Sequence, residues 1–333
     1  MNKKQILLSV VIPAFNIDSY IGECIQSIVP QMENNVELII IDDGSTDKTG
    51  DICDDIEINN KNISVYHQQN KGVSAARNVG LELSHGKYIL FVDGDDLLAP
   101  NAIKSIFAKI SENTPDIIAG SYVKFSGNTP THSTQQTSQK FIKEVESANG
   151  SKALELLLKN SLFLPSMWAN IFKRDLFITN SIYFNVNLSN NEDLDCAMRL
   201  YLKAKSIALL GESHYYYRKS RDGSATSVFK AARILDSLNF IRSLVGYIND
   251  FAGYSNLNKW LMDYMAYQYL IVLGSINLCP KTDRKQLLDE AKLWVGLLEY
   301  AIRRRTLIGY ITYRMFGLKF LAMLSAAYIR RKT

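Results

Sequence analysis

The sequence has little of the chemistry that builds disulfide frameworks or zinc sites. Its 333 residues include four cysteines, which lie far apart and form no C-x-x-C pair. Scattered thiols of this kind are typical of reduced cytosolic proteins. The four histidines are equally dispersed. The composition therefore predicts a cytoplasmic protein with no cysteine or histidine metal cluster.

The sequence also lacks long apolar runs and a strong net charge. No segment has eighteen uncharged apolar residues, which disfavours a conventional membrane span. A short apolar run near the N-terminus is interrupted by Pro13 and lacks a small-residue cleavage site, so we expect no signal peptide. The net charge of +5 gives no reason to expect a nucleic acid partner. At 47% hydrophobic residues, the chain is long enough for one large domain or two smaller ones.

Acidic residues are missing from the end of the chain. After Glu299 there are eight Lys and Arg residues, and the apolar stretch 307–329 contains Arg314 and Lys319. We expect residues 303–333 to form a basic amphipathic helix at an anionic cytoplasmic leaflet, with the two interior charges reaching water. A membrane-spanning helix is disfavoured by these charges. The remaining alternative is a helix that packs on its own domain or on a partner subunit, which would give an oligomer.

The first 120 residues alternate between apolar runs and amphipathic stretches. The runs predict strands at 6–12, 36–41, 63–66, 88–92 and 117–123. The stretches predict helices near 18–30, 46–58, 73–84 and 100–112. Such alternation predicts an α/β fold with a mostly parallel sheet and helices on both faces.

The rest of the chain predicts fewer strands and more helices. Residues 125–141 are rich in Ser, Thr, Gln and Asn and predict a loop or irregular hairpin. Helices are expected at 147–159 and after a cap at Asn190 or Asn191, two short strands within 206–220, and helices from about 228 onward. We therefore divide the chain into a domain at 1–225 and a helical region at 226–333.

Polar residues follow three of the predicted strands. They are Pro13–Asn16 after the first strand, Asp42–Ser45 after the second and Asp93–Asp96 after the fourth. Ligands of open α/β sheets bind beyond the carboxyl ends of the strands. These three loops are therefore expected to meet at one ligand-binding edge.

Asp42 and Asp43 stand side by side at this edge. Carboxylates there can accept hydrogen bonds from a ribose hydroxyl or a base N–H. The alternative is that this loop only caps the next helix, which explains Ser45 and Asp47 but does not need the adjacent pair.

Asp93 and Asp95 predict a metal site. In an extended segment alternate side chains point the same way, and two such charges repel by about 4 kcal/mol at 4 Å with an effective dielectric near 20. Mn²⁺ or Mg²⁺ would relieve this repulsion and bind substrate phosphates. Gly94 would leave room for a nucleotide, and Asp96 is either a third ligand or a turn residue. The alternative is a solvated acidic turn.

Arg77 predicts the matching positive charge. Gly72 permits a tight entry to the helix that carries it, and a guanidinium near a diphosphate is chemically sensible. The alternative is an ordinary residue on the helix surface.

These motifs together resemble the family 2 glycosyltransferases of bacterial polysaccharide synthesis, which have the Rossmann-like GT-A fold. The matching pieces are "SVVIPAFN", "LIIIDDGSTDKT", "NKGVSAARNVGL", "YILFVDGDD" and "NEDLDCAMRL", which span residues 9–200 in order. The resemblance implies a UDP-sugar site. Its residues would be Pro13, Phe15, Asn16, Asp42, Asp43, Arg77, Asp93 and Gly94.

The resemblance also implies the residues that perform the chemistry. Asp95, together with Asp93, would bind Mn²⁺ or Mg²⁺, and Asp193 would be the general base of an inverting transfer. Glu192 would orient groups near the acceptor. Trp168 either stacks on a sugar ring of the acceptor or packs in the core.

The sequence thus predicts an inverting, metal-dependent transferase that moves a hexose or N-acetylhexosamine from a UDP-sugar with β-linkage. The expected acceptor is a saccharide on polyprenyl diphosphate, for O-antigen or capsule, at the inner face of a bacterial membrane. A nucleotidyltransferase would need a glycine-rich phosphate loop, which we do not find. A non-catalytic sugar-nucleotide-binding or scaffold protein would not need Asp193.

Overall fold

The computed structural model describes residues 5–127, 137–188, 190–219, 231–250 and 255–331. They form two compact units, each considered by itself. The first unit comprises Met1–Leu154, Phe163–Val186 and Glu192–Arg221, and the second comprises Glu155–Leu162, Asn187–Asn191 and Asp222–Thr333. The boundary that we expected at 225/226 falls among residues 220–230, which lie outside the described residues.

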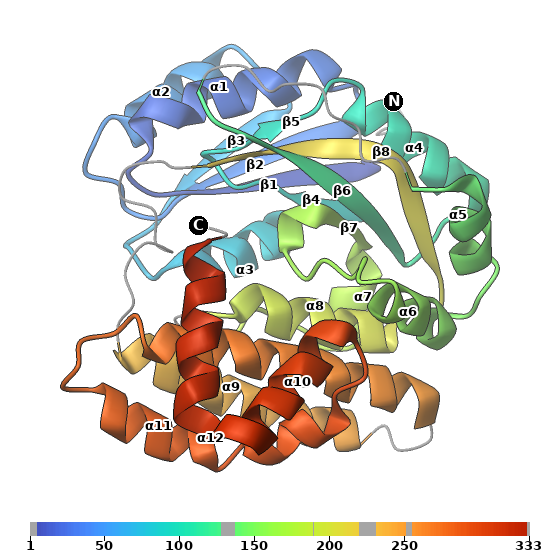
Figure 1. Ribbon diagram of the computed structural model, residues 1–333. Coiled ribbons are helices and arrows are strands. Elements are labelled where there is room, and N and C mark those ends of the chain that lie inside the picture. Colours follow the sequence, from blue (N-terminus) through green and yellow to red (C-terminus); the bar gives the residue numbers. More distant parts are fainter. Residues whose placement is uncertain (1–4, 128–136, 189, 220–230, 251–254, 332–333) are drawn as a thin grey trace. The chain divides into compact units, whose positions relative to one another are not determined.

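An eight-stranded sheet forms the centre of the first unit (Figure 1). Its spatial order is β3-β2-β1-β4-β7-β6-β8-β5. Neighbours among the first four strands run parallel, whereas β7 is antiparallel to both β4 and β6. The strands are β1 (Leu8–Ala14), β2 (Val36–Asp42), β3 (Ile63–His67), β4 (Tyr88–Phe91), β5 (Leu97–Leu98), β6 (Ile117–Phe125), β7 (Asn170–Lys173) and β8 (Ile207–Arg218). The predicted α/β class is confirmed.

Helices cover both faces of this sheet because its parallel strands are apolar on both sides. The first four are α1 (Asp18–Ile28), α2 (Thr49–Ile58), α3 (Val73–Leu83) and α4 (Ala102–Asn113). Ile12 and Ile40 belong to the core cluster that includes buried residues of α1 and α4. On the other face α3 lies so close that a Cβ on Gly80 would be 2.3 Å from Val11. Figure 1 shows α1 and α2 on one side of the sheet and α3 on the other.

Two expected elements differ from the structure. Part of the predicted loop 125–141 is helical, because α5 (Gln139–Glu146) precedes α6 (Gly150–Lys159), while residues 128–136 lie outside the described chain. The two short strands expected within 206–220 are one strand, β8. Its pairing with β6 shifts register between Ala119 and Tyr122, so an irregularity absorbs the break that the sequence suggested.

The remaining helices of the first unit come after α6 in the chain. They are α7 (Arg174–Thr179) and α8 (Glu192–Lys203), with the short turn η2 (Met167–Ala169) before β7.

The second unit is helical, as predicted. It contains α9 (Ala231–Asn249), α10 (Ser255–Ile276), α11 (Arg284–Lys292), η4 (Val295–Tyr300) and α12 (Arg304–Arg330). Among the helices described, α12 is long and apolar enough to cross a membrane by length and composition, with a mean hydropathy of 1.3. However, Gly317 has a φ of 77°, which breaks α12 into two halves.

Candidate active site

The loops that follow β1 and β2 are tied together by hydrogen bonds. The N–H of Asn16 donates to Ser45 Oγ at 3.1 Å, and the N–H of Thr46 donates to Asn16 Oδ1 at 2.8 Å. Asn16 adopts a left-handed φ of 49°, which Asn tolerates better than most residues. Pro13 is buried in β1, whereas Phe15 is 44% exposed. The loop therefore presents an aromatic face at the edge of the sheet.

Asp42 is held by the protein itself. Its Oδ1 accepts from the N–H of Ser45 at 3.1 Å, and its Oδ2 lies 2.8 Å from Nδ1 of His67. The carboxylate of Asp42, followed by that of Asp54 at 3.0 Å, raises the pKa of His67 above its ordinary value. Our sequence reasoning missed His67, although it is the last residue of β3 and so reaches the same edge.

Asp43 fixes the loop that leads into α3. Its carboxylate accepts from the side chain of Gln68 at 2.7 Å and from the N–H groups of Lys71 and Gly72, each at 2.8 Å. Asp42 and Asp43 are 4% and 3% exposed. Both carboxylates therefore have a structural role: Asp42 binds Ser45 and His67, and Asp43 binds the loop before α3.

The acidic segment after β4 is a tight turn. The N–H of Asp96 donates to the carbonyl of Asp93 at 3.0 Å, so our premise of an extended Asp93–Asp95 segment was wrong. A Cβ on Gly94 would lie 2.4 Å from Cδ1 of Ile17. The structural reason for glycine here is thus the close packing of the turn on the chain entering α1.

Asp96 is a turn residue anchored to β8. It is 1% exposed, and its two oxygens accept from the hydroxyl of Tyr215 at 2.8 Å and from the N–H of Arg218 at 2.7 Å. Burial, followed by the charges of Asp93 and Asp95, raises the pKa of Asp96 to about 8. Of the two roles that the sequence left open for Asp96, third metal ligand or turn residue, the structure shows the turn residue.

Arg218 is a second residue that our reasoning missed. Its Nε donates to the carbonyl of Asp95 at 2.9 Å, and its Nη2 pairs with Glu23 at 2.7 Å. The guanidinium lies 4.6 Å from the ring centroid of Phe125. Arg218 is the last residue of β8. It lies beside the acidic turn because β8 is the neighbour of β5 in the sheet, and this strand order could not be read from the sequence.

Arg77 lies at the centre of the site. Its side chain is 4% exposed, which rules out an ordinary position on the helix surface. One nitrogen donates to Asp93 Oδ1 at 2.9 Å and the other to Asp193 Oδ1 at 2.6 Å. Glu192 Oε1 is 3.6 Å away. Burial alone would lower the pKa of Arg77, but Asp193, Asp93 and Glu192 together raise it. Arg77 therefore stays charged and connects the acidic turn to α8.

Asp193 lies in the first turn of α8, where its second oxygen accepts from the N–H of Met167 at 3.0 Å. Burial raises the pKa of Asp193 to about 6, although the charge of Arg77 acts in the opposite direction. A carboxylate that titrates near neutral pH is suited to take up and release a proton.

The residues present fit a divalent cation bound together with phosphate. The part of the chain that the structure describes holds no group of three or more His, Cys, Asp or Glu side chains placed as a complete metal cage. Mg²⁺ at phosphate sites is usually held by only one or two carboxylates, however. Around Arg77, three carboxylates and one guanidinium leave two negative charges in excess (three minus one). Asp93 belongs to this cluster and Asp95 lies two positions further along the same turn; the sequence-based prediction assigns the ion to these two residues.

Trp168 is a core residue. It is 7% exposed and stacks on Tyr215 and Tyr217, with ring centroids 4.6 and 5.5 Å apart. The packing alternative is therefore the one that the structure shows, and an acceptor platform at Trp168 is not supported. His214 is also structural, because burial lowers its pKa to about 4 and its Nε2 lies 3.1 Å from the carbonyl of Trp168.

The strand order, the acidic turn after β4 and the carboxylates at one edge define an α/β protein of the GT-A type. Residues 9–179 match the family described as glycosyl transferase family 2, and the chain belongs to this family. It is a glycosyltransferase.

Three similar proteins illustrate the relationship. GlyG, a glycosyltransferase of Streptococcus pneumoniae serotype 4, is 33% identical over 223 residues that cover 66% of this chain and 72% of GlyG. Poly(ribitol-phosphate) beta-glucosyltransferase of Bacillus spizizenii is 32% identical over 226 residues, which are 66% of this chain and 33% of that longer protein. The crystal structure of S. aureus TarS 1–349 with UDP-GlcNAc has a TM-score of 0.72 and 20% identity, covering 97% of this chain and 92% of that chain. This last likeness concerns the fold.

Proposed function

We propose that this glycosyltransferase is an inverting, metal-dependent enzyme that transfers a hexose or N-acetylhexosamine from a UDP-sugar. The observation that carries the proposal is the bridge from Asp93 through Arg77 to Asp193, with distances of 2.9 and 2.6 Å. It holds a carboxylate that titrates near neutral pH beside a turn suited to a metal diphosphate. A protein that only bound sugar nucleotides would not need such a base.

The reaction would be a single displacement. The acceptor hydroxyl oxygen forms a bond to the anomeric carbon while the bond from that carbon to the UDP oxygen breaks, and the hydroxyl proton passes to Asp193. A cation held by Asp95 and Asp93 would stabilise the negative charge that develops on the diphosphate. Arg77 keeps Asp193 oriented and lowers its pKa, so that it is ionised before the attack.

The donor and the linkage are supported by the similar proteins. One solved relative was crystallised with UDP-GlcNAc, and another relative is named a beta-glucosyltransferase. For the acceptor we propose a saccharide on polyprenyl diphosphate in the synthesis of a bacterial surface polysaccharide. Two relatives are named as poly(ribitol-phosphate) glycosyltransferases, which supports a polymeric acceptor.

We further propose that the enzyme works at the inner face of the cell membrane and binds it peripherally through residues 303–333. The support is that α12 carries exposed apolar residues, including Met315 at 67% and Phe316 at 58%, in a segment with no acidic residue.

The test is an activity screen with matched variants. UDP-Glc, UDP-Gal, UDP-GlcNAc and UDP-GalNAc are offered with lipid-diphosphate GlcNAc or GalNAc, with Mn²⁺ or with a chelator, and UDP release is measured. Asp193→Asn should reduce kcat by about 10²–10⁴ while UDP still binds. Asp195→Asn is the control, because Asp195 lies on the same helix turn but pairs with Arg199. Wild-type turnover in Asp193→Asn would refute the base, and full activity in chelator would refute the metal.

A further inference from the structure

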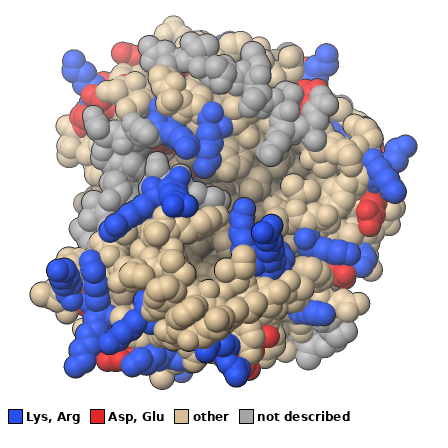
Figure 2. All heavy atoms as spheres, viewed as in Figure 1, with Lys and Arg blue, Asp and Glu red and all other residues tan. Residues whose placement is uncertain are grey.

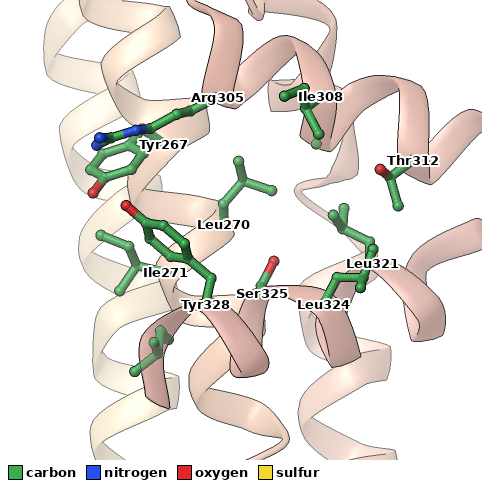
Figure 3. Close-up of a pocket in the computed structure, with 12 residues that line it drawn as sticks. Tyr267, Leu270, Ile271, Arg305, Ile308, Thr312, Leu321, Leu324, Ser325 and Tyr328 are labelled. Atoms are coloured by element: carbon green, nitrogen blue, oxygen red, sulfur yellow. The ribbon is translucent and has the colours of Figure 1, made fainter. Parts of the chain in front are cut away.

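A pocket lies inside the bend of α12. The two halves of this helix, 304–316 and 318–330, meet at Gly317, and both line the pocket together with α10 (Figure 3). Its volume is about 270 Å³, and its walls are mainly the aliphatic side chains of Leu270, Ile271, Ile308, Leu321, Leu324 and Ile329. Apolar cavities of about 150 Å³ already bind benzene in other proteins, so this one can hold part of a hydrocarbon chain.

The two halves of α12 that line the pocket are fixed against α10 by a buried carboxylate and by close packing at two glycines. Asp263 on α10 is fully buried and accepts from the N–H of Ile302 at 2.7 Å and from Thr306 Oγ1 at 2.5 Å, which fixes the start of α12. Two glycines allow close helix contact. A Cβ on Gly309 would lie 2.8 Å from Leu270, and one on Gly274 would lie 2.8 Å from the backbone of Ser325. Both halves of α12 are therefore in direct contact with α10.

One end of the pocket is polar and positively charged. Figure 3 shows the guanidinium of Arg305 and the hydroxyls of Tyr267 and Tyr328 at this end. Arg305 is exposed and lies 6.0 Å from the ring centroid of Tyr328. A ligand with a hydrocarbon chain and an anionic head would satisfy both parts of the pocket.

The exposed surface of α12 also combines apolar and positively charged side chains. Exposed apolar side chains continue along α12 at Ile311, Met315, Phe316, Phe320 and Met323. Arg304, Arg314, Lys319, Arg330 and Arg331 accompany them, and the segment has no acidic residue. Figure 2 shows blue side chains bordering uncharged surface in the lower half of the view, where α12 lies in Figure 1. Each half of α12 has thirteen residues, too few to cross a hydrocarbon core of about 30 Å, so the surface suits a membrane interface.

We propose that this pocket binds one hydrocarbon chain of an anionic membrane phospholipid, with the lipid phosphate at Arg305. The inference rests on the proposed peripheral membrane placement and adds a defined lipid site to it. The chain would enter between the two halves of α12, while the surrounding Lys and Arg residues contact neighbouring headgroups. The pocket is too small for a whole lipid, so the second chain would remain in the bilayer.

The test is flotation of the full chain with vesicles. Phosphatidylglycerol–phosphatidylcholine vesicles are compared with vesicles of phosphatidylcholine alone. Arg305→Gln removes the charge at the polar end, and Ser325→Phe fills the pocket. Their controls are Lys281→Gln, an exposed base elsewhere in the unit, and Ala327→Phe, an exposed position on the same half-helix outside the pocket lining. We expect the partition coefficient on anionic vesicles to fall at least tenfold in the first two variants and to change less than twofold in the controls.

A second measurement keeps the inference testable if Ser325→Phe does not fold. The fluorescence added by Tyr328→Trp should be quenched more strongly by lipids brominated along the acyl chain than by headgroup-region quenchers. If the wild type fails to float with anionic vesicles, the proposed membrane placement is wrong. If the wild type floats but Arg305→Gln and Ser325→Phe float equally well, the lipid site alone is wrong. Equal quenching by both classes of quencher would also overturn it.

Discussion

Arg77→Gln is the most informative perturbation of the site. Arg77 donates to Asp193 at 2.6 Å and to Asp93 at 2.9 Å, and its side chain is 4% exposed. Glutamine removes the positive charge but keeps a polar side chain. The variant therefore tests whether the charge of Arg77 controls the ionisation of Asp193, the proposed base.

The distance between Arg77 and Asp193 indicates how far the pKa of Asp193 should shift when the charge of Arg77 is removed. One pair of unit charges at 2.6 Å interacts by about 6 kcal/mol at an effective dielectric near 20, an upper value. Carboxylates next to an arginine usually have their pKa lowered by about 1 to 3, so its removal should raise the pKa of Asp193 by a similar amount from about 6. A base with a raised pKa is protonated up to a higher pH. The acid limb of the rate profile should move upward by about 1 to 3 pH units.

The assay is the pH dependence of kcat/KM for sugar transfer between pH 5 and pH 10. Activity of Arg77→Gln should be lowest relative to wild type below pH 7 and should recover at higher pH. Arg77→Lys keeps the charge and should return the limb toward the wild-type position. Lys173→Gln is the matched control, because Lys173 pairs with Asp116 at 3.5 Å and lies beside Tyr88, at the opposite end of β4. An acid limb that stays in place in Arg77→Gln would refute the reasoning.

Three further changes test the supports of the fold and of the site. Gly94→Ala would put a methyl group 2.4 Å from Ile17 and should lower the free energy of unfolding in urea by about 1–3 kcal/mol, unlike Gly22→Ala, whose added Cβ meets nothing within 4 Å. Asp96→Asn should flatten the pH dependence of unfolding. Because burial raises the pKa of Asp96 from 3.8 to about 8, wild-type stability falls as pH rises through this window, by at most about 1.4 kcal/mol per pH unit. Asp263→Asn removes a fully buried charge that pairs with Arg303 and should lower stability by about 3–5 kcal/mol in thermal unfolding.

Each of these three changes has a clear contrary result. Equal urea midpoints for Gly94→Ala and wild type would mean that the turn relaxes away from α1. Equal slopes of stability against pH in Asp96→Asn and wild type would mean that Asp96 is ionised when folded. An unchanged melting temperature in Asp263→Asn would mean that the contacts of the Asp263 carboxylate with the start of α12 do not contribute to stability.

The sequence predicted the first half of the sheet well because each of its strands is a short apolar run ended by a polar turn. β2 was expected at 36–41 and is Val36–Asp42, and α3 was expected at 73–84 and is Val73–Leu83. The parallel order of these strands also predicted that the loops after β1 and β2 meet at one edge of the sheet. β8 was split in the prediction because Gly211 and Ser213 interrupt its apolar pattern, whereas the structure accommodates them by a shift in register against β6.

The parts of the site that escaped prediction depend on contacts between distant segments. Arg77 and Asp193 are 116 positions apart, and no periodic pattern in either helix indicates that they meet. The three aspartates after β4 look alike in sequence, yet they differ in the structure because β8 passes beside the turn. Tyr215 and Arg218 on that strand bind Asp96, and Arg218 binds the carbonyl of Asp95. Asp96 is thereby held by β8, whereas Asp93 accepts a hydrogen bond from Arg77. A strand more than a hundred residues later in the chain thus makes one of three similar aspartates a buried support of the acidic turn.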